Sequence, residues 1–326
     1  MKAAVYRATG SPDVLRIEDI PAPQPASGEV LVRIHASGVN PSDTKTRSGM
    51  FPLGDGWERM VPHNDGAGLI EDVGAGVSAS RVGERVWLHT TQWGGFNGTA
   101  AAYAVARADR AIRLPDDVSF AAGATFGVPL LTAWQSVMMN GAVDGRTVLV
   151  QGGAGAVGNY AIQIARAKGA RVITTVSAPA KAAAARGAGA DEVIDYRREN
   201  VTARVLEATK GRGVDHLIEV NLSVNGPKLD AWVKPGGFIA VYGSDDPMAE
   251  IPAISAIVRQ LRFGFFLVYE LAPDVLAAAT RDLTELLASG RLQPYIDEVF
   301  PLERVADAHR RVEEGAALGN VVVSVA

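Results

Sequence analysis

The residues best suited to chemistry in this chain are the glycines of a short segment that follows an apolar run. Residues 147–150 read Thr-Val-Leu-Val, and Gly153, Gly155 and Gly158 follow before an apolar helical pattern that reaches Ala165. In a G-x-G-x-x-G pattern the glycines permit a tight turn, close approach of the backbone to a pyrophosphate, and close helix–strand packing. The helix would point free N–H groups at the phosphates. The segment predicts a dinucleotide-binding turn; a glycine-rich turn of another α/β protein is the alternative.

The residues after the next predicted strand indicate which dinucleotide binds. An NAD site usually places Asp or Glu there to hold the ribose 2′-hydroxyl. Here the strand over residues 171–177 ends at Ser177, and the next acid is Asp191. Ser177 can donate a hydrogen bond, Lys181 supplies positive charge, and Tyr196 can donate or stack, so we predict NADPH. Arg186 and Arg197 are further candidates for the 2′-phosphate. A solvated helix face for Lys181 and a partly buried loop position for Tyr196 are the alternatives.

Composition and charge exclude several classes of function. The chain has 326 residues, 48% of them hydrophobic, with a net charge of −4. Without a basic run we expect no nucleic acid partner. No apolar run approaches the roughly 18 residues of a membrane span, and residues 1–7 show no hydrophobic leader, so we expect a cytoplasmic protein without a membrane partner. The absence of cysteine excludes disulfides and Cys-based zinc sites. The five histidines are scattered, so we predict no metal site.

The pattern along the chain predicts two domains. Residues 1–120 are β-rich, with short strands separated by Gly, Pro and Asp. From residue 121 onward strands and helices alternate, as in a doubly wound parallel sheet; residues 226–233 are predicted to be one of these helices and residues 237–243 one of the strands. The last strand, over residues 320–325, is expected to return to the first domain. We therefore predict a β-rich domain of residues 1–120 and 297–326, and a cofactor domain of residues 121–296.

One strand of the second domain indicates self-association. Residues 261–269 read Leu-Arg-Phe-Gly-Phe-Phe-Leu-Val-Tyr and follow the other strands, so they could form an exposed sheet edge. Pairing two such edges would give a homodimer. An internal strand covered by the helix predicted over residues 273–290 is the alternative.

Several motifs together resemble the medium-chain dehydrogenase/reductase superfamily, and within it the zinc-free quinone oxidoreductase (zeta-crystallin-like) branch. Besides the glycine-rich turn, they occupy residues 36–43, 47–49, 65–68, 73–76, 83–86, 128–133, 169–170 and 236–237. The resemblance implies an α/β protein with a GroES-like catalytic domain and a Rossmann cofactor domain. It implies transfer of hydride from NADPH to quinones or related electron-poor acceptors, with an alkenal or enone (C=C) reductase as the alternative, and a homodimer or homotetramer. A structural or RNA-binding role is the non-enzyme alternative, which the acidic charge and the intact turn disfavour.

The resemblance also implies that catalytic zinc is absent. Zinc alcohol dehydrogenases of this superfamily carry a ligand Cys where Asn40 stands and a ligand His where Asn64 stands, and the four-Cys structural lobe is missing here. Without a Lewis acid to stabilise an alkoxide, alcohol oxidation is disfavoured and a quinone or enone acceptor is favoured.

Carried over position by position, the family's contacts give a predicted site. Asn40 and Thr132 are the candidate catalytic groups, as donors to an acceptor oxygen that gains charge; for Asn40 a turn position before Pro41 is the alternative, and Asp43 is read as a helix cap. Phe51 stands where relatives often have Tyr, and Asn320 replaces a frequent Lys. Ser223 is an alternative to Asn225. The predicted cofactor-binding residues are Asn40, Phe51, Thr132, Gly153, Ala154, Gly155, Ala156, Val157, Gly158, Ser177, Lys181, Tyr196, Asn225, Tyr242, Gly243, Ser244, Phe266, Leu267, Val268 and Asn320.

Overall fold

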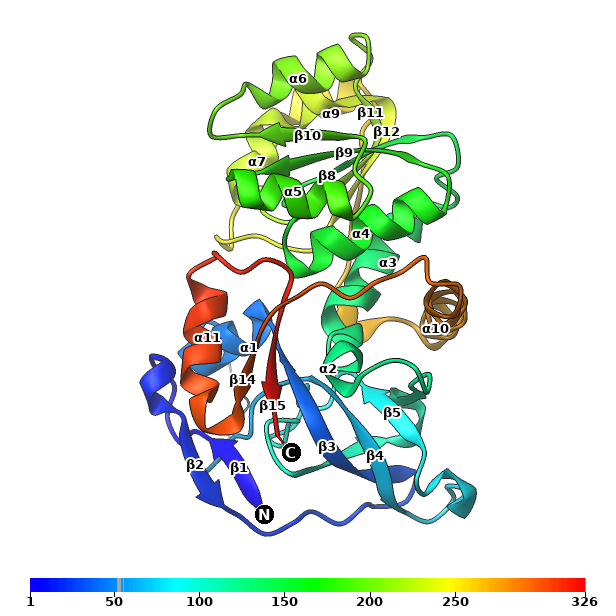
Figure 1. Cartoon of the computed structure of the whole chain (residues 1–326). Helices are drawn as coiled ribbons and strands as arrows, with labels where there is room; N and C mark the ends of the chain where they lie inside the picture. Colours follow the sequence, from blue (N-terminus) through cyan, green and yellow to red (C-terminus); the bar gives the residue numbers. More distant parts are fainter. Residues whose placement is uncertain (52–53, 55, 326) are drawn as a thin grey trace. The chain divides into compact units, whose positions relative to one another are not determined.

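A computed structural model describes all residues except 52, 53, 55 and 326, and it divides the chain into two compact units (Figure 1). The first unit contains Met1–Pro129 and Pro294–Ala326, and the second contains Leu130–Gln293. Both ends of the chain therefore belong to the first unit. The predicted fold class, a GroES-like domain with a Rossmann-type parallel sheet, is confirmed.

The first unit is built on a mainly antiparallel seven-stranded sheet. Its strands in spatial order are β14 (Ile296–Pro301), β15 (Asn320–Ser324), β3 (Glu29–Val39), β4 (Asp65–Val73), β5 (Arg85–Leu88) and β7 (Ala111–Arg113), with β6 (Tyr103–Arg107) also paired to β3. A two-stranded sheet of β1 (Lys2–Val5) and β2 (Arg16–Asp19) and the helices α1 (Pro41–Ser48), α2 (Phe120–Gly123) and α11 (Val305–Glu313) complete it. Because β15 pairs antiparallel with β3, the predicted return of the last strand is confirmed.

The second unit is a doubly wound sheet of six parallel strands. The spatial order is β10 (Glu192–Asp195), β9 (Arg171–Val176), β8 (Thr147–Val150), β11 (Val214–Glu219), β12 (Val233–Val241) and β13 (Arg262–Phe265). In sequence order within the sheet this is 3-2-1-4-5-6, the arrangement of dinucleotide-binding folds, and the direction of winding reverses between β8 and β11. Ligands of such sheets bind beyond the carboxyl ends of the strands at that point.

Helices cover both faces of this sheet (Figure 1). On one face Leu149, Ile173 and Leu217 pack with Val205 of α6 and Trp232 of α8 in a buried cluster, and α4 packs against β8 and β9 on the sheet's other side. Burying each large aliphatic side chain stabilises the fold by about 1.5–3 kcal/mol. The helices of this unit are α3 (Leu131–Met138), α4 (Ala156–Ala167), α5 (Pro179–Gly187), α6 (Val201–Ala208), α7 (Leu222–Asn225), α8 (Leu229–Trp232), α9 (Ala253–Val258) and α10 (Pro273–Ala288).

Two local predictions differ from the structure. The helix predicted over residues 226–233 is a short 3₁₀ turn followed by α8, and Val233 already begins β12, which ends at Val241 rather than at residue 243. Pairing of Val233 with Val214 accounts for the early start of the strand, because a neighbouring strand supplies hydrogen bonds that the local pattern does not show. Apart from these two predictions, residues Phe126–Leu130 form a π-helical turn that precedes α3.

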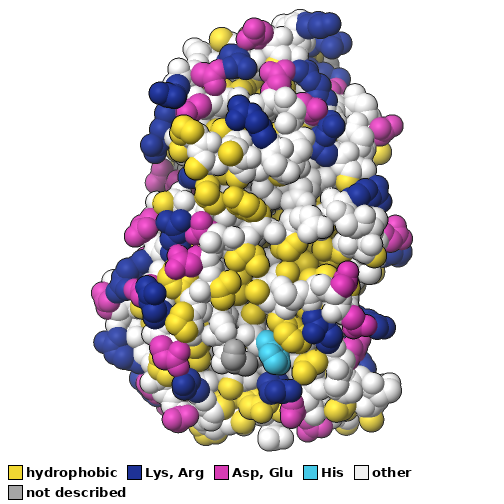
Figure 2. Space-filling model, in the orientation of Figure 1, with side chains coloured by type: hydrophobic (Ala, Val, Ile, Leu, Met, Phe, Trp, Pro, Cys, Tyr) yellow, Lys and Arg dark blue, Asp and Glu magenta, His cyan; other side chains and the backbone are white. Residues whose placement is uncertain are grey.

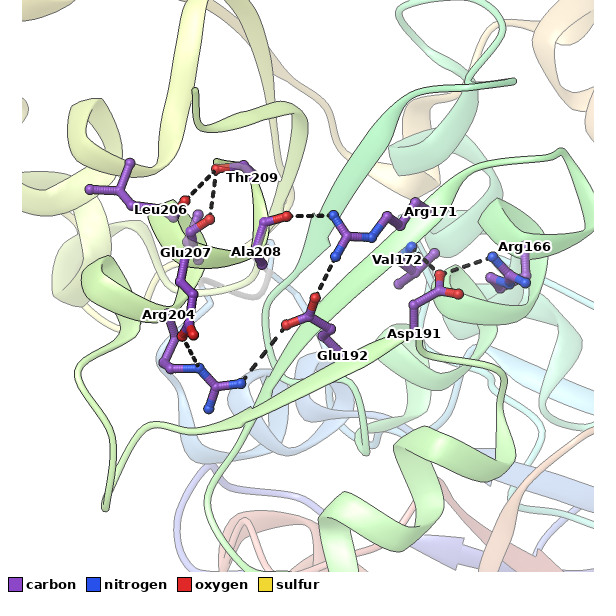
Figure 3. Close-up of polar contacts among 11 residues, drawn as sticks. Arg166, Arg171, Val172, Asp191, Glu192, Arg204, Leu206, Glu207, Ala208 and Thr209 are labelled. Atoms are coloured by element: carbon purple, nitrogen blue, oxygen red, sulfur yellow. Dashed lines mark hydrogen bonds and ion pairs between the residues drawn. The ribbon is translucent and has the colours of Figure 1, made fainter. Parts of the chain in front are cut away.

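The β10 edge of the sheet is covered by charged side chains. Figure 3 shows Arg171 of β9 between Glu192 of β10 and the carbonyl oxygen of Ala208, while Arg204 of α6 pairs with Glu192 and Glu207. Charged groups along an edge strand discourage pairing with another chain. The other surface charges are also mixed in sign: on the face drawn in Figure 2, basic and acidic side chains alternate without a basic patch. Among the helices that the structure describes, none is long and apolar enough to cross a membrane.

Candidate functional site

The glycine-rich turn joins the end of β8 to the start of α4 and needs glycine for three different reasons. Gly152 has a φ of +69°, in the left-handed region that favours glycine. A Cβ on Gly153 would collide with the Thr174 hydroxyl, and one on Gly158 would collide with the Gly152 carbonyl. A Cβ on Gly155 would meet nothing closer than 3.4 Å. A side chain at position 153 or 158 would therefore collide with neighbouring atoms of the second unit, whereas one at position 155 would have room.

The open position lies where a phosphate would bind. Gly155 is the N-cap of α4, and the first helical hydrogen bond is donated by Asn159 to the Gly155 carbonyl. The N–H groups of the first helical turn lack partners within the helix and carry the positive end of its dipole. Together the open space and these donors fit the pyrophosphate of a dinucleotide. Ala154 completes the turn, and Ala156 and Val157 are the first residues of α4.

The residues predicted for the 2′-phosphate gather at the carboxyl ends of β9 and β10. Ser177 follows β9, Lys181 lies near the start of α5, and Tyr196 follows β10 with 52% of its surface exposed. The Tyr196 amide donates to the Val176 carbonyl at 3.0 Å, which holds the two strand ends together. Ser177 and Tyr196 thus follow neighbouring parallel strands at their carboxyl ends, and the binding role of these three residues stays a prediction.

The first acid that follows β9 in the sequence lies at the amino ends of the strands, opposite to the carboxyl ends where Ser177 and Tyr196 lie. Asp191 precedes β10, and its carboxylate accepts hydrogen bonds from the Arg166 guanidinium at 2.9 Å and the Val172 amide at 2.7 Å (Figure 3). Asp195, which does end β10, accepts from the Arg197 amide at 3.1 Å. Asp191 is thus placed where it would not repel a 2′-phosphate beside Ser177.

The remaining predicted residues of the second unit, apart from Thr132, also follow the ends of strands. Asn225 ends the short helix after β11, and its amide donates to Glu219 Oε1 at 2.9 Å. Tyr242, Gly243 and Ser244 follow β12, and the Ser244 hydroxyl accepts from the Ser223 amide at 3.2 Å. Phe266, Leu267 and Val268 follow β13 at the same edge, since Phe265 is in register with Val241. Thr132 is a buried residue of α3.

In the first unit Asn40 lies between two buried carboxyl groups. It is the N-cap of α1. Its backbone N–H donates to Asp43 Oδ2 and its side-chain Nδ2 donates to Asp65 Oδ2, both at 2.8 Å. Asn64 Nδ2 donates to Asp43 Oδ1 at 3.0 Å. Burial raises the pKa of Asp43 to about 6 and that of Asp65 well above its usual range. The reading of Asp43 as a helix cap fits this bond, and Asn40 has a structural role in the turn before Pro41.

The other two predicted residues of the first unit differ in their surroundings. Phe51 is partly exposed. Asn320 begins β15, and its side chain donates to the Tyr295 carbonyl at 3.0 Å, so the amide is used in holding the strand. Asn40, Phe51 and Asn320 belong to the first unit and all the other predicted site residues to the second.

One further arrangement in the first unit resembles a nucleophile and its base. The Ser37 hydroxyl lies 2.7 Å from His63 Nδ1, but both side chains are fully buried, and the same hydroxyl lies 2.7 Å from that of Thr99. A nucleophile needs access to its substrate. We therefore interpret this pair as part of the core.

Sequence reasoning missed two buried acids next to the predicted residues, Asp65 beside Asn40 and Glu219 beside Asn225. Glu219 carried a usable signal, since an acid that directly follows the buried residues Leu217 and Ile218 at the carboxyl end of a parallel strand has few structural reasons to be there. Asp65 had no such signal, because its bonds to Asn40 and to the Val128 amide join segments far apart in the sequence.

Comparison with known proteins places this geometry in context. Residues 26–116 match the family described as alcohol dehydrogenase GroES-like domain, and residues 188–323 match that described as zinc-binding dehydrogenase. The quinone oxidoreductase of Homo sapiens is 32% identical over 99% of this chain and 97% of its own. A solved NAD-dependent alcohol dehydrogenase is 29% identical with a TM-score of 0.92, and a mycobacterial protein solved with NADPH is 31% identical with a TM-score of 0.91; each comparison covers 100% of both chains.

The residues at the zinc-ligand positions do not fit a zinc ion. Asn40 and Asn64 each donate one side-chain N–H to a buried carboxyl group, and Asn64 Oδ1 accepts from the Trp93 backbone amide at 2.8 Å. Zinc in proteins is held by thiolate, imidazole and carboxylate groups. Across the described parts of the chain, no three His, Cys, Asp or Glu side chains gather as a metal site would require.

Proposed function

We propose, since this chain belongs to the quinone oxidoreductase branch of the medium-chain dehydrogenase/reductase superfamily, that it is an NADPH-dependent oxidoreductase whose acceptors are quinones. The observation that carries the proposal is the turn at Gly155, open to a ligand at the switch point of the parallel sheet. NADPH, when bound, supplies the hydride. The protein supplies position and electrostatics.

Residues of the second unit would hold the cofactor. The turn from Gly153 to Gly158 is suited to the pyrophosphate, because its N–H groups and helix dipole attract negative charge. Ser177, Lys181 and Tyr196 are suited to the 2′-phosphate, because a hydroxyl and an ammonium group donate strong hydrogen bonds to phosphate oxygens. The mycobacterial relative solved with NADPH supports NADPH as the cofactor.

The donor set of the first unit supports quinones as the acceptors. In this superfamily alcohol oxidation uses a bound zinc ion as the Lewis acid. The side-chain amides of Asn40 and Asn64, which are already bonded to Asp65 and Asp43, are not suited to hold that ion. A quinone already accepts hydride readily, and its oxygen then gains charge that a hydrogen-bond donor can stabilise. Asn40 is our candidate donor in the first unit, because its amide keeps a second N–H beyond the one given to Asp65. Thr132 is the candidate in the second.

The experiment is NADPH oxidation by the full chain with three acceptors: 1,2-naphthoquinone, an alkenal, and a ketone as the reverse of alcohol oxidation. We expect the quinone to be reduced with the highest kcat/KM and the ketone not to be reduced. Reduction of the alkenal in preference to the quinone would replace the proposal with a C=C reductase. A protein that binds NADPH and reduces none of the three would be a binding protein instead.

A further inference from the structure

The last residue of β11, Glu219, is a carboxyl group with no exposed surface whose hydrogen-bond partners are uncharged amides. Its Oε1 accepts from the Asn221 backbone amide at 2.6 Å and from Asn225 Nδ2 at 2.9 Å. Its Oε2 is buried, and among the described residues it has no hydrogen-bond partner. Burial raises the pKa of Glu219, and the bonds from Asn225 and Asn221 only partly oppose that effect.

Such a group is costly for the fold. A buried carboxyl without a cation loses its hydration, and an apolar residue of similar size in its place is often neutral or stabilising. The neighbours of Glu219 on its strand, Leu217 and Ile218, are fully buried apolar residues of that kind. What Glu219 adds, and an apolar side chain would not, is a fixed acceptor for two specific N–H groups.

Three segments predicted to bind the cofactor meet at Glu219 and Val220. The turn lies alongside, since the Gln151 amide donates to the Ile218 carbonyl at 3.0 Å. The segment after β12 lies on the other side, since the Tyr242 amide donates to the Glu219 carbonyl at 3.2 Å and a Cβ on Gly243 would collide with the Val220 carbonyl. The third segment, residues 221–225, is the one that Oε1 holds.

These contacts also continue from one segment to the next. The Leu222 amide donates to the Gly243 carbonyl at 3.1 Å, and the Ser223 amide donates to the Ser244 hydroxyl at 3.2 Å. A displacement of residues 221–225 would therefore move residues 242–244 as well. Glu219, at the end of the central strand β11, is the side chain that joins residues 221–225 to the sheet.

We propose that Glu219 is a positioning residue for the dinucleotide, whose Oε1 fixes Asn225 and residues 221–225 in the conformation that binds NADPH. The inference rests on the proposed function only in taking NADPH as the ligand. It does not depend on the acceptor. Because Glu219 acts by geometry and not by reading the 2′-phosphate, its loss affects NADPH and NADH alike.

The test compares Glu219→Ala, Glu219→Gln, Asn225→Ala and the double variant Glu219→Ala/Asn225→Ala in the full chain, with NADPH and NADH affinities measured by titration without acceptor. The control is Glu285→Ala, on the exposed face of α10. We expect E219A to weaken both cofactors about tenfold, the loss expected when a bond to a buried acceptor is removed. We expect E219Q to recover most of that loss, since its Oε1 can accept both bonds. The double variant should lose no more than the worse single one.

The outcomes separate the inference from its alternatives. Parental affinity in E219A would overturn it, as would fully additive losses in the double variant, because Glu219 would then not act through Asn225. Losses in E219Q as large as in E219A would overturn it in favour of a role for the charge. If E219A does not fold, E219Q and N225A decide: an impaired E219Q, or an N225A that binds like the parent, overturns the inference. A parent chain that binds NADPH but reduces no quinone contradicts the proposed function alone.

Discussion

His63 and His309 are 246 positions apart in the sequence, yet their Nε2 atoms lie 2.9 Å apart in the core of the first unit and their rings stack. The hydrogen-bond network assigns which ring donates. The Thr99 hydroxyl donates to the Asp65 carbonyl at 2.5 Å, so it must accept from Ser37, whose oxygen then accepts from His63 Nδ1. His63 Nε2 therefore accepts from His309, and both rings are neutral.

This pair predicts that its own contribution to the stability of the fold weakens in mild acid, opposite in sign to the contribution of buried Asp43 and Asp65, whose raised pKa values make the folded state bind protons. Burial lowers the pKa of His63 to about 3 and that of His309 well below its usual value, while both have a pKa near 6.5 in the unfolded chain. Above about pH 6.5 neither state binds the proton. Below it only the unfolded chain does, so the free energy of unfolding falls by up to about 1.4 kcal/mol per pH unit for each histidine. Denaturant unfolding between pH 7 and pH 5 measures this slope. We expect His309→Gln to be less stable at pH 7 but to have a shallower slope; an unchanged slope would contradict the assignment.

We predict that the parent binds NADPH at least tenfold more tightly than NADH, and that Lys181→Ala removes most of the difference. Lys181 and Ser177 lie at the carboxyl end of β9, and the nearest following acid, Asp191, is bonded at the other edge. Only NADPH carries the phosphate that an ammonium group would bind, so its affinity should fall about tenfold while that of NADH changes little. Arg212→Ala is the control, since it removes a positive charge near the amino end of β11. Equal affinities of the parent for NADPH and NADH would contradict the prediction.

Gly155→Ala should weaken NADPH and NADH to a similar extent, about tenfold, without unfolding the protein. The φ of Gly155 is −77°, which alanine adopts without strain, and its Cβ would have room in the free protein. The methyl group would occupy the space left for the pyrophosphate, which both cofactors share. Titration of both cofactors and a thermal melt of the free protein measure the two effects. Gly187→Ala, at the end of α5 with open space around it, is the matched control; parental affinity in G155A would mean that the phosphates bind elsewhere.

Activity should survive removal of metal ions. The amides of Asn40 and Asn64 are bonded to Asp65 and Asp43 rather than held ready for a cation. We expect quinone reduction to be unchanged after prolonged dialysis against a chelator, and elemental analysis to find less than a tenth of an equivalent of zinc, an order-of-magnitude bound for a chain without thiolate or clustered imidazole ligands. One equivalent of zinc whose removal abolishes turnover would contradict this prediction.

The parts of the molecule that the sequence could predict are those decided locally. The turn at Gly153 to Gly158 and the strand-end positions of Ser177 and Tyr196 follow from spacing along two successive βαβ units, β8–α4–β9 and β9–α5–β10. The His63–His309 pair and the Asn40–Asp65 bond could not be predicted, because each joins residues that only the tertiary fold of the first unit brings together, His309 from α11 and Asp65 from β4. The local pattern predicts a helix at Val233, because nothing in the neighbouring residues shows that Val214 pairs with it. Long-range hydrogen bonds, which local patterns do not encode, account for all three.

We predict a homodimer that forms along β13, because the two edges of the six-stranded sheet differ in character. The β10 edge carries Arg171, Glu192 and Arg204 in ion pairs, whereas Phe265 on β13 is 62% exposed and stacks on Phe263. Beside that edge strand, α9 leaves Ile254 and Ile257 more than 70% exposed. An apolar edge with unpaired backbone groups favours pairing with a second copy about a two-fold axis.

Sedimentation at micromolar concentration should therefore give about twice the chain mass of 34.2 kDa. Phe265→Glu should shift the protein to monomer, because a carboxylate in each copy would be buried opposite its mate at a cost of several kcal/mol. Since Phe266, Leu267 and Val268 continue from β13 and are predicted to contact the nicotinamide, the same variant should also lower kcat. Val299→Glu, a charged substitution at an exposed valine of the outer strand β14 in the first unit, is the control and should leave assembly and turnover unchanged. A monomeric F265E with full turnover would show that assembly does not support the site, and a monomeric parent would remove the interface altogether.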